Sequence, residues 1–155
     1  MIPMPPMKRT PLEGDRERRE DYFLDAQIGF ILRQAQQRHT AIFASLMIEG
    51  VTPTQWAAIS KLHERGPCSQ NLLGRLTAMD AATIKGVIDR LTKRGFTATT
   101  ADPADGRRLL VALTPEGAQA FARGAPMAAR ITAATLEPLS APEREAFVAL
   151  LRRLG

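Results

Sequence analysis

The chain has 155 residues, of which 45% are hydrophobic and 24% are charged, a composition typical of one folded domain and not of a disordered chain. A single cysteine, Cys68, excludes an internal disulfide framework, and no apolar run approaches the roughly 18 residues that a membrane span needs. The first 20 residues lack the apolar core of a signal peptide, so we expect a cytoplasmic protein.

The formal net charge of +5 is concentrated in the middle of the chain. Residues 61–108 carry nine basic and five acidic side chains, hence +4, whereas the rest of the chain is nearly balanced. Positive charge gathered in one segment is typical of a module that binds a polyanion. A basic surface that is merely hydrated is the alternative.

The N-terminal part of the chain predicts an arm followed by a long helix. Residues 1–20 are rich in proline and then in mixed charges, which predicts a mobile arm. From about Asp21 to Ile48, apolar side chains recur every three or four positions, which predicts one helix. This apolar stripe consists of Leu24, Ile28, Ile31, Ala35, His39, Ile42 and Leu46, and Phe23, Phe30 and Phe43 widen it. One small domain cannot cover so much apolar surface, so we expect dimerisation.

Three shorter helices are predicted next. Thr52-Pro53 starts a helix that stops at Gly66-Pro67, because Thr is a good N-cap and Pro suits the first helical position. A short helix follows from Ser69 to about Leu76, and Asp80 caps a third that Gly95 closes. The inward face of the third helix consists of Ile84, Val87, Ile88 and Leu91. Three helices with a tight turn before the last form a helix-turn-helix pattern.

The C-terminal part predicts a hairpin and two helices. FTATT and LLVALT have the composition of strands, and the DPADGRR between them is a turn with a basic tip. Thr114-Pro115 starts a helix to about Arg123, after which Gly124 and Pro126 are expected to bend the chain. Ser140-x-x-Glu143 is a capping box before the last helix, whose apolar face consists of Phe147, Leu150, Leu151 and Leu154.

The order of elements predicts a mainly α fold, a winged helix-turn-helix with terminal helices that form a dimerisation domain. The DNA-binding lobe covers residues 51–123, and the dimerisation helices cover 21–50 and 124–155. Here the sequence resembles the MarR family of bacterial transcription factors, over about residues 21–154. The wing DPADGRRLLVALTPEG is similar to the family's Asp-x-Arg wing followed by Leu-Thr-x-x-Gly, and LGRLTAMDAATIKGVIDRLTKRG is similar to its recognition-helix region.

Within the family, the segments LTAMDAATIKG and TPTQWAAISKL look most like repressors of aromatic-acid catabolism, particularly of the nicotinate-degradation type. The resemblance implies a homodimer that binds a double-stranded DNA operator and a small aromatic carboxylate effector. It implies no cofactor.

The predicted recognition helix supplies the candidate DNA contacts. Its N-terminal, solvent-facing residues enter the major groove; these are Asp80, Ala81, Thr83 and Lys85. Gln70 and Asn71, at the start of the preceding helix, have free backbone N–H groups suited to phosphate. Three further basic residues either contact phosphates or are simply hydrated, namely Arg75, Lys93 and Arg94.

At the predicted wing, Arg107 is the strongest single candidate for a DNA contact. An arginine on a hairpin tip can enter a narrow minor groove, where the negative potential is enhanced. Asp105 can brace its guanidinium in a bidentate pair. The family often carries another basic residue where Gly106 stands, so Arg108 is expected to take over a phosphate contact. Alternatively, Asp105 and Arg107 only shape the turn.

The candidate effector residues are His39, Phe43, Trp56 and His63. Both histidines fall on apolar helical faces, and the resemblance implies a pocket between the dimer helices and the DNA-binding lobe. There Trp56 and Phe43 would hold an aromatic ring, and a histidine or arginine would meet its carboxylate. Two hydrogen-bonded core histidines are the alternative. No metal site is expected, because zinc usually takes three or four protein ligands.

The sequence therefore predicts a ligand-responsive repressor, released from a pseudo-palindromic operator by a hydroxynicotinate-like aromatic or pyridine carboxylate. Cys68, just before a short helix, leaves open an oxidation-responsive regulator. An architectural DNA-binding protein without an effector is a further alternative. No Ser-His-Asp order, glycine-rich phosphate loop or carboxylate pair is found, so we expect no enzyme, and a small enzyme that uses His39 and His63 remains as a rival.

Overall fold

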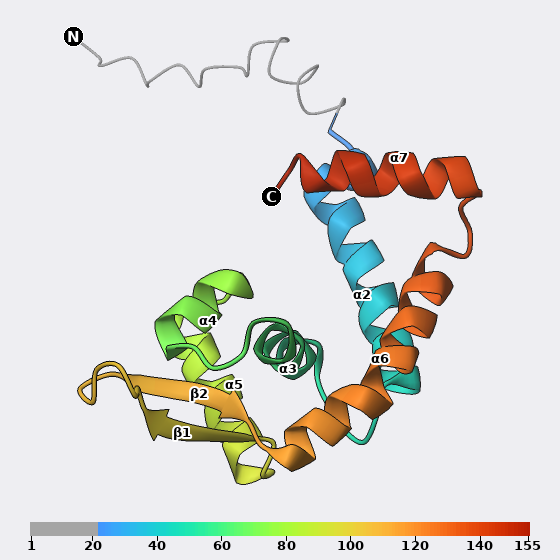
Figure 1. The fold of residues 1–155 in the computed structure, drawn as a ribbon. Coiled ribbons are helices and arrows are strands. Elements are labelled where there is room, and N and C mark those ends of the chain that lie inside the picture. The colour runs from blue at the N-terminus through green and yellow to red at the C-terminus, as the bar shows by residue number, and fades with distance from the viewer. Residues whose placement is uncertain (1–21) are drawn as a thin grey trace, which may run out of the picture. The chain divides into compact units, whose positions relative to one another are not determined.

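The computed structural model describes residues 22–155, and the predicted arm over residues 1–20 lies outside the described residues. The elements are η1 (Leu24–Ala26), α2 (Ile28–Leu46), α3 (Pro53–Arg65), α4 (Gln70–Leu76), α5 (Ala81–Lys93), β1 (Thr97–Ala101), β2 (Leu109–Leu113), α6 (Pro115–Leu136) and α7 (Ala141–Arg152) (Figure 1). The chain divides between residues 37 and 38, within α2, into two compact units.

The first unit begins differently from the prediction. The expected single helix from Asp21 is replaced by the 3₁₀ turn η1 and by α2, which starts only at Ile28. Gln27 separates them because its backbone is extended (φ −84°, ψ 128°) and its side-chain Nε2 donates to the carbonyl of Phe23 at 3.1 Å. Large apolar side chains of this unit are exposed: Tyr22, Phe23, Leu24, Ile28, Ile31 and Leu32.

The helices of the second unit begin where the sequence predicts. In each case a side-chain oxygen accepts the backbone N–H three residues further on, which satisfies one of the open donors of the helix end. The N-caps are Thr52, Ser69, Asp80, Thr114 and Ser140. Thr52 with Gln55, and Ser140 with Glu143, form complete capping boxes.

The core of the second unit lies among α3, α4, α5 and β2. The predicted inward face of α5 is confirmed, since all four of its apolar side chains are buried. The buried cluster consists of Val51, Ala58, Ile59, Leu62, Cys68, Leu73, Ile84, Val87, Ile88, Leu91 and Val111. This core sets the orientation of α5 relative to α4, and therefore which face of α5 stays open to solvent.

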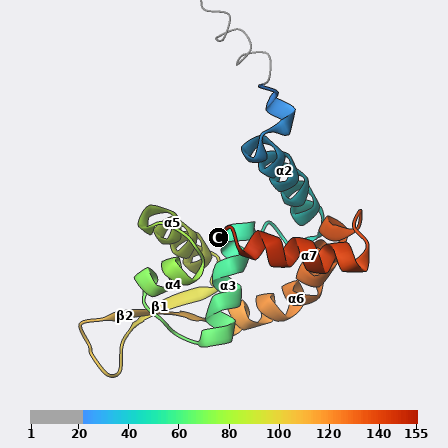
Figure 2. The ribbon, with the colours of Figure 1, turned by 90° about the horizontal axis from the view of Figure 1, so that it is seen from above.

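The predicted hairpin is confirmed as an antiparallel pair. Thr97 pairs with Leu113 and Ala101 with Leu109. Cys68 forms an isolated antiparallel bridge with Val111 of β2. The N–H of Cys68 donates to the carbonyl of Val111 at 3.1 Å, and the N–H of Val111 donates to the carbonyl of Cys68 at 2.8 Å. Seen from above, the loop between β1 and β2 extends away from α3, α4 and α5 (Figure 2).

Helix α6 differs from the prediction. It does not end near Arg123 but runs as one helix from Pro115 to Leu136, with Pro126 inside it. Proline costs a helix one backbone bond and crowds the preceding turn. The buried face of α6, which contains Gly117, Ala120, Gly124 and Ile131, overrides this local penalty. Tertiary packing therefore decides the length of the helix.

Candidate DNA interface and effector pocket

The open face of α5 carries the predicted base-reading residues. Asp80, Ala81, Thr83 and Lys85 are all exposed. Lys85 Nζ lies 2.8 Å from Asp89 Oδ2, one helical turn away, in an exposed ion pair. Exposed pairs of this kind contribute little to stability, so the ammonium group of Lys85 remains available to a stronger anionic partner.

Asp80 has a structural role at the start of α5. Its Oδ1 accepts the backbone N–H of Thr83 at 2.7 Å. The hydrogen bonds from the backbone and side chain of Thr83 lower the pKa of the Asp80 carboxyl from its ordinary value of 3.8. The carboxylate is therefore ionised at neutral pH and orients the first turn that carries Ala81 and Thr83.

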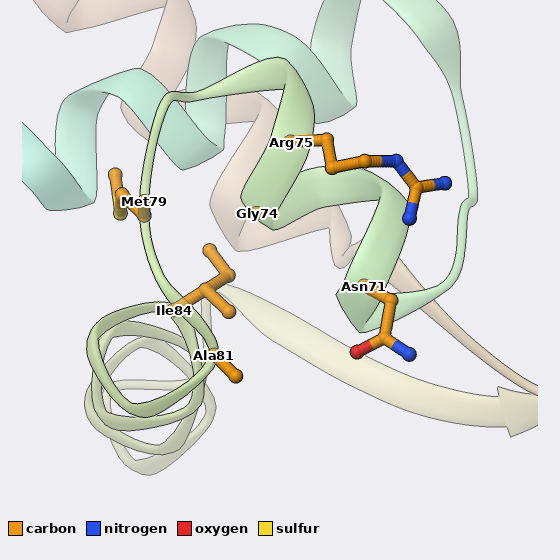
Figure 3. A pocket seen from close by; sticks show the side chains of 6 residues that line it. All are labelled: Asn71, Gly74, Arg75, Met79, Ala81 and Ile84. Carbon is orange, nitrogen blue, oxygen red and sulfur yellow. The ribbon is translucent and has the colours of Figure 1, made fainter.

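A hollow of about 200 Å³ separates the start of α5 from α4. Figure 3 shows Asn71 and Arg75 on α4 and Ala81 on α5 around it. The helices approach closely at Gly74, where an added Cβ would lie 3.1 Å from Ile84 Cγ2 and from the carbonyl oxygen of Met79. Two predicted contacts thus share one hollow with Arg75, whose role the sequence left open. Gln70, half-buried, begins α4 beside Asn71.

The wing exposes Arg107 and Arg108, but the expected side-chain pair between Asp105 and Arg107 is not formed. Asp105 Oδ1 accepts the backbone N–H of Arg107 at 3.1 Å, and the carbonyl of Asp105 accepts the N–H of Arg108 at 3.0 Å. Asp105 therefore shapes the tip and does not brace the guanidinium of Arg107. Both arginines are exposed, and within residues 22–155 neither guanidinium makes an ion pair.

His39 lies at the junction of α2 with the end of α6. Its Nδ1 is 2.9 Å from Thr135 Oγ1, and its ring centroid is 6.2 Å from that of the buried Phe43. The neighbouring Arg38 donates from both terminal nitrogens to the carbonyls of Ala134 and Thr135. His39 is half-buried, and the sequence did not identify Thr135, 96 residues away, as its hydrogen-bond partner.

Trp56 and His63 meet at a third ring, Phe121, which the sequence analysis did not single out. The ring centroids of Trp56 and Phe121 are 5.5 Å apart and nearly parallel, and those of His63 and Phe121 are 3.7 Å apart. His63 is exposed, not buried as its helical face predicts. Trp56 also covers Gly124, where an added Cβ would overlap Cζ3 of the indole ring.

The four predicted effector residues thus fall into two groups, His39 with Phe43 and Trp56 with His63. In the described chain no ring contact joins the two groups. A cavity of about 300 Å³ lies beside the first group and is lined by Thr40, Phe43, Ala44, Met47, Ile48, Gly50, Val51, Thr52 and Pro53. Of the four predicted residues, only Phe43 lines this mostly apolar space, which we call the α2–α3 cavity.

The comparisons with known proteins show which family has this fold. Residues 51–109 match the model of the MarR family. Over 134 residues the chain is 38% identical to the HTH-type transcriptional repressor NicR of Pseudomonas putida, a match that covers 86% of this chain and 85% of NicR. The chain belongs to the MarR family.

Two solved structures extend the match. A crystal structure of a probable transcriptional regulator from Pseudomonas aeruginosa has 58% identity and a TM-score of 0.84, covering 86% of this chain and all of that one. Bordetella bronchiseptica BpsR, whose DNA binding is regulated by 6-hydroxynicotinic acid, has 40% identity and a TM-score of 0.81, covering 86% and 96%. This MarR-family chain is therefore a winged helix-turn-helix transcription regulator.

Two further kinds of chemistry concern this MarR-family chain, oxidation of Cys68 and metal binding. Cys68 is 5% exposed, and its burial raises the pKa of the thiol, partly offset by the charge of Arg65. A raised pKa disfavours the reactive thiolate, which argues against oxidation sensing. Within residues 22–155 no three His, Cys, Asp or Glu side chains lie together as a metal site, and no helix is long and apolar enough to cross a membrane.

Proposed function

We propose that this chain is a homodimeric repressor that acts in the cytoplasm and binds a pseudo-palindromic operator. Each subunit would read one half-site, with half-sites about 10–10.5 bp apart, because that spacing places two recognition helices on one face of the duplex. The observation that carries the proposal is that one lobe exposes three features: the outer face of α5, the hollow beside Arg75, and two wing arginines that make no ion pair within residues 22–155.

The proposed contacts divide by what they read. Thr83 and Lys85 would meet base edges in the major groove, and Ala81 a thymine methyl. Arg107 would enter the minor groove. The residues proposed to contact phosphate are Gln70, Asn71 and Arg108, whereas Asp80 and Asp105 would act by orienting the backbone of α5 and of the wing.

The proposed dimer is supported by apolar surface that the described chain leaves open. On α7 and just after its end, four large side chains are 43–73% exposed: Phe147, Leu150, Leu151 and Leu154. The first unit separately exposes six large apolar side chains, from Tyr22 to Leu32. Contiguous apolar patches are uncommon on monomeric proteins and mark association surfaces.

We propose that the effector is a small aromatic or pyridine carboxylate. The support is the 40% identity to BpsR, whose DNA binding 6-hydroxynicotinic acid regulates, together with the α2–α3 cavity, which has the size and apolar lining of a one-ring site. Phe43 would contact the ring, and His39, whose ring centroid lies 6.2 Å from that of Phe43, would meet the carboxylate. Trp56 and His63, which do not line this cavity, would form an alternative site beside Phe121.

Fluorescence anisotropy tests both halves of the proposal. A duplex isolated from a random-sequence library by binding to the protein should bind at least about 10³-fold tighter than random DNA. Added 6-hydroxynicotinate should release it, and cyclohexanecarboxylate, which lacks an aromatic ring, should not. If the carboxylate meets His39, the variant His39→Ala should keep DNA binding and lose release, and if it meets His63, the variant His63→Ala should do so.

Two results would contradict the proposal. Equal affinity for selected and random DNA would indicate an architectural protein. Full release of both histidine variants at the parental effector concentration would show that the histidines are ordinary structural residues and that the carboxylate is bound elsewhere.

A further inference from the structure

The short turn between α2 and α3 forms one wall of the α2–α3 cavity. Met47, Ile48, Gly50 and Val51, all from this turn, line the space. Gly50 has a φ of +63°, in the left-handed region that glycine adopts readily, and Val51 is buried in the core of the DNA-binding lobe. A ligand in the cavity would therefore contact the backbone of this turn directly.

Arg94 fastens the same turn to the recognition helix. It follows the last residue of α5, and its own backbone N–H donates to the carbonyl of Arg90 at 3.1 Å. Its Nη2 donates to the backbone carbonyl of Glu49 at 2.7 Å, between two residues that line the cavity. The guanidinium also lies 4.8 Å from the ring centroid of Phe96, just before β1.

The bond to Glu49 depends on the conformation of the turn and not on any side chain of the turn. Its acceptor is a main-chain oxygen, so a shift of the turn by about 1 Å would take the 2.7 Å contact out of hydrogen-bond range. Helix α5 has 13 residues and is about 20 Å long. Because a helix moves as a stiff rod, a displacement at its Arg94 end changes the position of Thr83 and Lys85 near the other end.

We propose that Arg94 is a positioning residue that couples occupancy of the α2–α3 cavity to the recognition helix. The inference rests on the proposed function, in which an effector weakens DNA binding. It gives Arg94 a role that differs from a phosphate contact or a hydrated charge. Coupling between two sites in proteins typically changes an affinity by about 5–150-fold, and Arg94 would carry most of that factor here.

The first test measures coupling with 6-hydroxynicotinate as the probe. Calorimetry without DNA gives the affinity of the probe, and anisotropy gives the DNA Kd with and without saturating probe. Arg94→Gln should bind the probe within about twofold of the parent, while the probe-induced rise in DNA Kd should fall at least fivefold. Lys93→Gln is the matched control, because it removes the same charge one residue earlier without touching Glu49. It should keep the parental rise.

The second test needs no ligand and so separates this inference from the identity of the effector. Ala44→Phe places a large side chain in the cavity that Ala44 lines, and Ala44→Leu is a milder version if the first variant melts early. Filling the cavity should raise the DNA Kd at least fivefold when Arg94 is present and less than twofold with Arg94→Gln. This is a double-mutant cycle in which the non-additive part reports the link.

The outcomes of the two tests differ for each failure. If the probe never binds but the cycle is non-additive, the effector is wrong and the role of Arg94 stands. If the cavity-filling substitution and Arg94→Gln act additively, the coupling role of Arg94 is overturned. If Arg94→Gln weakens DNA binding equally with and without probe, Arg94 contacts phosphate instead.

Discussion

At the scale of single residues, the carboxylate of Asp105 in the wing bonds the backbone of Arg107 and not its guanidinium group. Because Asp105 Oδ1 accepts the backbone N–H of Arg107, the guanidinium of Arg107 has no acidic partner within residues 22–155 that it would give up in the proposed DNA contact. The desolvation and pairing cost of binding is therefore smaller than it would be for a braced guanidinium.

We predict that Arg107→Ala weakens operator binding by about 1–3 kcal/mol, because it removes the proposed minor-groove contact while the tip keeps its backbone bonds. Anisotropy at fixed salt measures the effect. Arg123→Ala, which removes an exposed arginine from α6, serves as the control and should change the affinity little. An unchanged affinity of the Arg107 variant would rule out the minor-groove role.

A second residue-scale prediction concerns Gly124. A methyl group there would overlap the indole ring of Trp56, so Gly124→Ala should destabilise the protein by about 1–3 kcal/mol, as overpacking does. In Gly86→Ala the new methyl group meets only the mobile guanidinium of Arg90, so the better helix propensity of alanine should stabilise by about 0.5–1 kcal/mol. Urea unfolding of both variants checks the difference, and equal midpoints would contradict it.

The residues that sequence could predict are those whose partners are close along the chain. The N-caps at Thr52, Asp80 and Ser140 bond three residues ahead, so their local pattern is sufficient. Phe121 stacks on rings from α3, and Arg94 reaches a carbonyl 45 residues away. No local pattern contains such contacts. The two groups of effector candidates could not be separated for the same reason.

At the scale of elements, the cap of α5 is electrostatic as well as geometric. The N–H of Thr83 lowers the pKa of the Asp80 carboxyl. Ionised Asp80 therefore stabilises the folded state at pH values above the ordinary pKa of 3.8. This contribution is lost as the pH falls through the lower, folded-state pKa. Asn is also a good N-cap but carries no charge.

We therefore predict that Asp80→Asn has a lower Tm than the parent from pH 7 to about 5, and that the difference closes below about pH 4. Circular-dichroism melts at several pH values measure this. Glu143, whose pKa the N–H of Ser140 lowers in the same way, is present in both proteins and cancels from the comparison. A difference that persists unchanged at pH 2.5 would show that the charge of Asp80 contributes nothing.

Helix α6 shows where local signals fail at this scale. The sequence predicts that the helix runs to about Arg123 and that Gly124 and Pro126 bend it, yet one helix continues to Leu136. Gly124 does not break the helix. It leaves space for the indole ring of Trp56, because it has no side chain. Gly117 acts in the same way toward the carbonyl oxygen of Phe96. A glycine that breaks a helix and one that receives a neighbour look the same in a sequence.

At the scale of the whole molecule, the open apolar surface of α7 determines the proposed assembly. If this face is covered only by a second copy, folding and association are one process, and the Tm should rise with protein concentration. Melts over a hundredfold concentration range, with sedimentation at both ends, measure this. Leu150→Glu on α7 should lower the Tm and favour a monomeric mass. A melt that does not depend on concentration, with a monomeric mass for the parent, would reject the dimer.

The stack of Trp56 on Phe121 also gives the protein an optical property. Trp56 is the only tryptophan, so indole emission comes entirely from the contact between α3 and α6. Any event that alters that contact, whether a ligand, an operator or the onset of unfolding, changes the polarity around a single fluorophore. The fluorescence of the unlabelled protein thus reports directly on the contact between α3 and α6.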